Sequence, residues 1–154
     1  MAVAEDFLRR ALQLAHANAA AGGRPFGAVV VKDGRVVATG VNEIAATGDP
    51  TAHAELQALR AASKMLGTTR LDGCVVYASG HPCPMCLSAM YLTGISSAEY
   101  VYSNEDAEAY GLSTASIYAD LAVPPAHRTF RLTHVPIEEE GDRLYEAWKK
   151  AQRS

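Results

Sequence analysis

Two short motifs, far apart in the sequence and each at the start of a predicted helix, constrain the fold of this chain more than any other feature. The first carries His53 and Glu55, and the second carries Cys83 and Cys86. Residues two positions apart on a helix do not share a face, so His53 and Glu55 cannot form a surface pair. Both residues could act at one site if the fold brings the two helix starts to one small cavity.

Around these motifs, apolar periodicity predicts strands that alternate with helices. Two β-branched runs meet at Asp33-Gly34, which is a strong hairpin signal. Asp49 and Pro50 fit the N-cap and the first position of the next helix. This pattern indicates a layered α/β sheet that opens with an antiparallel hairpin. Helices are predicted over residues 3–23, 49–66, 83–94 and 138–152, and strands within 26–42 and over 73–79, 97–103 and 128–137.

The composition is that of one globular domain. The chain has 154 residues, of which 49% are hydrophobic and 20% charged, and it can bury a substantial core. We find no internal repeat or linker, so residues 1–154 are predicted to form a single domain.

Composition also bounds the location and the partners. No apolar run is long enough to span a membrane, and the N-terminus lacks the apolar core of a secretory signal. A reducing, cytoplasmic location is therefore expected, and three cysteines do not form a paired disulfide framework. The net charge of −3 argues against broad nucleic-acid binding, which usually leaves a basic face.

The cysteine motif alone has two interpretations. Pro82 and Pro84 bias Cys83 into the first turn of a helix, with Cys86 one turn further along the same face. A C-x-x-C pair at a helix start serves either thiol–disulfide exchange or metal binding. A catalytic zinc site needs three protein ligands and an open position, and His53 would supply the third ligand.

Glu55 favours the catalytic interpretation. A zinc ion held by one neutral histidine and two thiolates acidifies water, which then needs a proton acceptor beside it. Glu55 is predicted to take that proton and to return it to the leaving group. A redox pair would leave Glu55 unexplained, and a structural zinc site would need a fourth ligand, for which the candidate is the cramped His81. Cys74 lies in an apolar strand and is predicted to belong to the core.

The pattern H-x-E followed by P-C-x-x-C is a signature of zinc-dependent deaminases. Along almost its whole length the chain resembles the cytidine deaminase-like superfamily, and within it the bacterial guanine deaminases. The resemblance implies a three-layer α/β/α sandwich with a mixed five-stranded sheet, usually assembled as a homodimer. It also implies that His53, Cys83 and Cys86 bind Zn²⁺ and that Glu55 shuttles protons. The stretches that carry it are RPFGAVVVKDG, DPTAHAE, LDGCVVYAS and PCPMCLSAMY.

Four further residues are expected to contact the substrate. By resemblance, Asn42 hydrogen-bonds the ring edge of a base and Phe26 packs at the pocket. His81 stands where guanine deaminases tend to carry a glutamate. Thr114, with Ser113, stands where they carry two acids. We expect His81 and Thr114 to line the pocket.

These departures shape the expected substrate. Leu92 replaces an aromatic residue of the guanine deaminase pattern, and the tail lacks the aromatic residue that closes the guanine pocket. Loss of acids and of flat aromatic surface favours a single-ring amino-heterocycle such as cytosine, isocytosine or a triazine. We therefore expect a hydrolytic deaminase that uses water to release ammonia from a free base, with guanine as the alternative. A tRNA adenosine deaminase and a non-catalytic zinc module are the rivals, and neither nucleic acid nor membrane is an expected partner.

Overall fold

The computed structural model describes residues 3–152, in which a mixed four-stranded sheet forms the centre. The strands lie in the order β2-β1-β3-β4. Strand β1 is antiparallel to both of its neighbours, and β3 is parallel to β4. The expected α/β fold with a mixed sheet is confirmed. The strands are β1 Gly27–Lys32, β2 Arg35–Val41, β3 Cys74–Gly80 and β4 Ser97–Tyr102.

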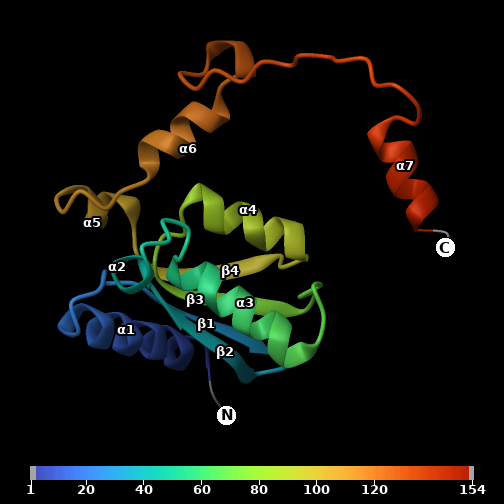
Figure 1. Ribbon diagram of the computed structural model, residues 1–154. Coiled ribbons are helices and arrows are strands. Elements are labelled where there is room, and N and C mark those ends of the chain that lie inside the picture. The colour runs from blue at the N-terminus through green and yellow to red at the C-terminus, as the bar shows by residue number, and fades with distance from the viewer. Residues whose placement is uncertain (1–2, 153–154) are drawn as a thin grey trace. The chain divides into compact units, whose positions relative to one another are not determined.

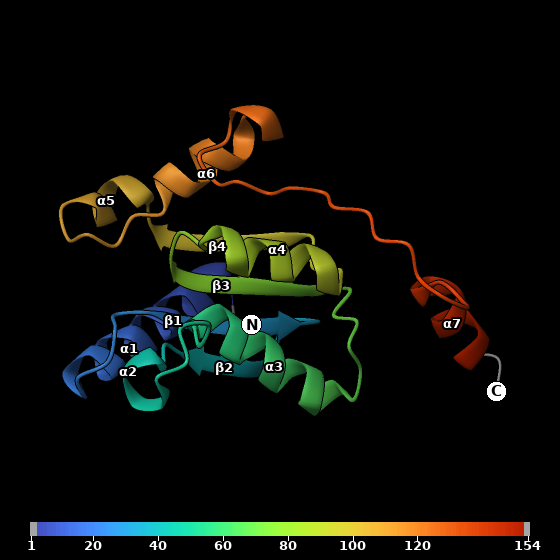
Figure 2. The same ribbon diagram turned by 45° about the horizontal axis from the view of Figure 1, so that its top comes forward.

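Helices cover both faces of this sheet, with α1 on one face and α3 and α4 on the other (Figures 1 and 2). Alternate residues of β1 point to opposite sides: Val29 packs toward α1, whereas Val30 packs toward α3 and α4. The helices are α1 Ala4–Ala20, α2 Ile44–Thr47, α3 Ala54–Leu66, α4 Pro84–Thr93, α5 Asn104–Glu108, α6 Ala115–Ala122 and α7 Leu144–Ala151, with a 3-10 turn at Pro125–His127.

The predicted fifth strand is wrong. Residues 131–139 have no regular secondary structure, and no strand among residues 3–152 pairs with them. Phe130, Leu132 and Ile137 are exposed there. Alternation in a sequence predicts which face a strand would bury, but it does not supply the neighbour whose backbone groups a strand needs.

The described chain divides into two compact units. The first, up to Ala119, holds the sheet and helices α1 to α5, and the second runs from Asp120. Within the second unit, Asp120 accepts hydrogen bonds from the backbone N–H of Thr129 (2.9 Å) and from its hydroxyl (3.1 Å). A single domain over residues 1–154 stays a prediction. No helix in the described part of the chain is long and apolar enough to cross a membrane.

The two helices that carry the motifs begin later than predicted. Helix α3 begins at Ala54, so His53 rather than Asp49 is its N-cap residue. Asp49 instead closes a turn, in which its Oδ1 accepts from the N–H (2.8 Å) and the hydroxyl (2.7 Å) of Thr51. Cys83 is likewise the N-cap of α4, with Pro84 in the first helical position. Both motifs therefore lie where a loop meets a helix.

Close packing of α3 on β2 depends on Gly40. A Cβ at this position would lie 2.5 Å from the backbone nitrogen of Ala58 and closer still to the carbonyl oxygen of Ala54. We expect Gly40→Ala to lower the free energy of unfolding by about 1–3 kcal/mol, because the start of α3 must move away from the sheet. Urea unfolding of both proteins measures this effect.

Gly80→Ala is the matched control, since a Cβ there meets Phe26 at an ordinary 3.6 Å. Its free energy of unfolding should stay within about 0.5 kcal/mol of the parent value. Equal stability of the Gly40 variant and the parent would show that α3 does not pack this closely on β2.

Candidate metal centre and pocket

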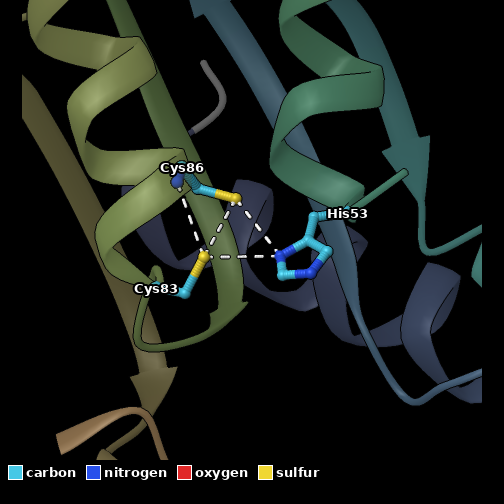
Figure 3. Close-up of side chains that lie close together, drawn as sticks. All are labelled: His53, Cys83 and Cys86. Carbon is cyan, nitrogen blue, oxygen red and sulfur yellow. Dashed lines mark hydrogen bonds between the residues drawn. The ribbon is translucent and has the colours of Figure 1, made fainter. Parts of the chain in front are cut away.

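Three potential metal ligands converge from the starts of α3 and α4 (Figure 3). The Nδ1 atom of His53 lies 3.4 Å from Sγ of Cys83 and 3.5 Å from Sγ of Cys86. The two sulfur atoms are 3.5 Å apart. Strand β3 leads into α4, and the segment after β2, which includes α2, leads into α3, so the sheet brings the two motifs together. Within residues 3–152 these side chains form the one such cluster.

The spacing of these atoms fits zinc. Tetrahedral zinc with bonds of about 2.0–2.1 Å to nitrogen and about 2.3 Å to sulfur separates nitrogen from sulfur by about 3.5 Å and sulfur from sulfur by about 3.8 Å. The distances from His53 match the first value, and the Cys83–Cys86 distance is close to the second. Two thiolates and one neutral imidazole also balance the charge of Zn²⁺. His53, Cys83 and Cys86 could therefore hold Zn²⁺ as three ligands and leave one position open.

The electrostatics of the cluster favour a thiolate at Cys83. Hydrogen bonding to Cys86, and then to His53, lowers the pKa of the Cys83 thiol to about 4. The same contact with Cys83 raises the pKa of Cys86, and burial adds to this effect. Hydrogen bonding to Cys83 raises the pKa of His53. The backbone N–H of Cys86 also points at Sγ of Cys83 (3.5 Å), as expected at a helix start.

Glu55 lies beside this cluster and is buried, with 5% of its surface exposed. Burial raises the pKa of its carboxyl group to about 7, against an ordinary value of 4.5, and a hydrogen bond from Cys86 opposes the rise. A carboxyl group with a pKa near neutrality can both accept and release a proton at physiological pH. Glu55 therefore has the environment that a proton shuttle needs.

The raised pKa of Glu55 predicts a pH-dependent stability. Because the folded pKa is above the unfolded one, the difference in pKa adds no cost to folding well below pH 4.5. The cost grows as the pH rises to about 7, and then stays constant. In metal-free protein at pH 8, Glu55→Gln should therefore raise the free energy of unfolding by about 3 kcal/mol. Urea titrations at pH 8 and pH 4 measure this, and an equal gain at both values would contradict it.

A cavity of about 180 Å³ is lined by His53, Cys83 and Glu55. All four residues expected at the substrate line it, namely Asn42, Phe26, His81 and Thr114. Sequence reasoning missed other members of the lining. They are Arg24 in the loop before β1, Ala54, and residues 111–112 in the loop after α5. No spacing marks Arg24 or residues 111–112, because only the fold brings their two loops to the motifs.

One amide and one hydroxyl of this lining have hydrogen-bonding capacity left for a ligand. Asn42 is buried, and its Oδ1 accepts from the backbone N–H of Ile44 (3.1 Å), so its amide hydrogens are the donors left for a ligand. The hydroxyl of Thr114 is buried without a hydrogen-bond partner among the described residues. A buried hydroxyl in this state typically costs about 1–3 kcal/mol, which a polar ligand in the cavity would recover.

A second, larger cavity of about 290 Å³ lies next to the first. Phe26, His81 and Leu112 line both cavities, so they form the wall between them. The second cavity is bordered by α1, by the end of β4 and by α5.

The sequence matches the family of the cytidine and deoxycytidylate deaminase zinc-binding region over residues 1–102, which include both motifs. It is 42% identical to a guanine deaminase of Bacillus subtilis over 94% of this chain and 93% of that protein. A crystal structure of a Bacillus subtilis guanine deaminase superposes with a TM-score of 0.82, covering 97% of this chain and 92% of that one.

Two other proteins are similar over much of the chain. A tRNA-specific adenosine deaminase of Aquifex aeolicus is 33% identical over 97% of both chains. A protein crystallised in complex with 2,6-diaminopurine is 33% identical, with a TM-score of 0.70, over 74% of this chain and 64% of that one.

Proposed function

This chain belongs to the family of the cytidine and deoxycytidylate deaminase zinc-binding region, and on that premise we propose that it deaminates guanine. It is a zinc-dependent hydrolytic deaminase. The observation that carries the choice of guanine is the likeness to a guanine deaminase over nearly the full length of both chains. A homodimer and a cytoplasmic location stay predictions from the sequence.

The support for guanine outweighs the expected preference for a single-ring base. That expectation rested partly on Leu92, which is 80% exposed on α4 and does not line the cavity. Losing an aromatic side chain at this position therefore removes no flat surface from the pocket within the described chain. Ser113 and Thr114 do line it, and there the replacement of acids by hydroxyls still distinguishes this chain from the guanine deaminase pattern.

The residues of the cavity suit the steps of a hydrolytic deamination. Zinc, when bound, supplies Lewis acidity that lowers the pKa of a water molecule to about 7. Glu55 accepts the proton of that water as the amino-bearing ring carbon is attacked. Glu55 passes this proton to the ring nitrogen and then moves the second proton of the water to the amino group, which leaves as ammonia, as a carboxyl group with a pKa of about 7 can.

The remaining lining residues hold the base. Asn42 donates its amide hydrogens to an acceptor on the ring edge, while its oxygen accepts from the backbone N–H of Ile44. The unpartnered hydroxyl of Thr114 provides a second polar contact. Phe26 and His81 supply ring surface at the wall of the cavity. A site of buried polar groups discriminates strongly against bases that leave those groups unpaired.

The similarity to a tRNA-specific adenosine deaminase supports a second candidate, adenosine in tRNA. A tRNA-binding surface would track many phosphates with basic side chains, and the net charge of −3 opposes this. We therefore rank it below the free base.

A panel of substrates tests the proposal. Ammonia release is measured for guanine, adenine, cytosine, isocytosine and amino-triazines, for the matching nucleosides, and for tRNA. Guanine is expected to give the highest kcat/KM, and the Glu55→Gln variant provides the enzymatic blank. A higher kcat/KM for any single-ring base would restore the expectation from the sequence, and deamination of tRNA alone would replace guanine by the second candidate.

A further inference from the structure

Asn104, the first residue of α5, joins two residues of the cavity wall that lie far apart in the sequence. Its Oδ1 accepts from the backbone N–H of Thr114 (3.1 Å), and its Nδ2 lies 2.7 Å from Nδ1 of His81. Asn104 itself borders the larger neighbouring cavity. One side chain therefore ties His81 to the loop that carries Thr114.

This arrangement fixes the direction of both hydrogen bonds. The backbone N–H of Thr114 can only donate, so it must face the amide oxygen of Asn104. The amide NH₂ of Asn104 must then face His81, and Nδ1 of His81 must accept. A flipped amide would place two donors against each other at Thr114. The proton of the His81 ring is consequently on Nε2, which is the donor left for a ligand.

The plane of the His81 ring is fixed as well. Tyr100 and Tyr118 stack on it, with ring centroids 4.6 Å and 5.1 Å away and interplanar angles of 14° and 8°. The hydroxyl of Tyr118 donates to the carbonyl oxygen of Pro82, and the backbone N–H of His81 donates to that of Tyr102 (2.8 Å). Stacking on both faces and a bond at Nδ1 leave the ring one orientation at the cavity wall.

We propose that Asn104 is a positioning residue that makes His81 present an Nε2–H donor to the substrate and so selects a base with a hydrogen-bond acceptor on the facing edge. The choice of base rests on the proposed function. Guanine offers a carbonyl oxygen at carbon 6, whereas 2,6-diaminopurine has an amino group there and keeps the same 2-amino group. An ionised glutamate at position 81 could only accept hydrogen bonds, whereas Nε2–H of His81 donates one. His81 therefore presents a donor where a glutamate would present an acceptor.

The first test is spectroscopic and needs no substrate. In ¹⁵N-labelled zinc-loaded enzyme, long-range ¹H–¹⁵N correlation spectra in alkaline buffer identify which ring nitrogen of each histidine carries the proton. His81→Phe assigns the His81 signals by their loss. In the parent protein the proton should be on Nε2, and a proton on Nδ1 would overturn the proposal.

Asn104→Asp separates positioning of His81 from anchoring of the loop. An aspartate oxygen still accepts from Thr114, and an acid is favourable in the first turn of α5, so the fold is retained. It cannot donate to His81, so the proton of that ring should move to Nδ1. A signal that stays on Nε2 in this variant would reduce Asn104 to a loop anchor and contradict its assigned role.

The second test compares kcat/KM for guanine with kcat/KM for 2,6-diaminopurine. The ratio should fall by about tenfold or more in His81→Phe, which keeps an aromatic ring between the two tyrosines but removes the donor. It should fall in the same direction in Asn104→Asp. An unchanged ratio in both variants would refute selection by His81. Failure of the parent enzyme to deaminate guanine would instead count against the proposed function, and the spectroscopic result would still decide the role of Asn104.

Discussion

Replacing Glu55 by glutamine should lower kcat by at least about 10²–10⁴-fold while zinc stays bound in full amount, because general acid–base groups typically contribute this much. The amide is nearly the same size as the carboxyl group, so the cavity and the proposed ligands His53, Cys83 and Cys86 should keep their places. It cannot take up a proton from water, however. One group that serves both as acceptor and as donor loses both roles in a single substitution.

Turnover is measured by ammonia release, and zinc by elemental analysis of the same samples. Glu5→Gln is the matched control, since Glu5 is an exposed carboxylate on α1 that pairs with Arg9. The control should keep the activity and the zinc of the parent. Near-normal turnover in the Glu55 variant would remove Glu55 from the mechanism, whereas loss of zinc would identify it as a ligand.

Each half of the metal cluster could be predicted because its sequence signals are local, and the fold then brings the two halves together. His53 and Cys83 each end a loop at a helix start, and short-range signals such as Pro84 mark that boundary. The sequence placed these starts up to a few residues too early. His53 and Glu55 still line one cavity. His53 is the N-cap residue of α3 and Glu55 lies in its first turn, so both are at the N-terminal end of this helix.

The pocket wall and the fifth strand depend on contacts that local patterns do not specify. Residues 111–114 line the cavity, where Asn104 accepts a hydrogen bond from the backbone N–H of Thr114, and no local sequence pattern links those two residues. The alternation over 128–137 resembles that of a strand, but the described residues offer it no paired neighbour. The raised pKa of Glu55 likewise arises from burial, which a sequence motif does not report.

Replacing either cysteine ligand should have an effect as large as the loss of Glu55, but through the metal. Cys83→Ala or Cys86→Ala should weaken zinc binding by more than about 100-fold, since changes to residues that only support the ligands already cost 10–100-fold. The remaining thiolate and His53 would hold zinc at two points instead of three. Activity should fall with zinc content, and excess zinc should restore little of it.

Cys74→Ala is the control that makes this prediction specific. Cys74 is a core residue of β3. Only 2% of its surface is exposed, and it packs among apolar side chains away from His53. Its loss should change the free energy of unfolding by about 1 kcal/mol and leave zinc stoichiometric.

Zinc ligation joins the starts of α3 and α4, so each ligand variant should also unfold at a lower temperature than the zinc-loaded parent. Without zinc, the parent and the variants should unfold at the same temperature. A ligand variant that binds zinc as tightly as the parent would show that the cluster is not the zinc site.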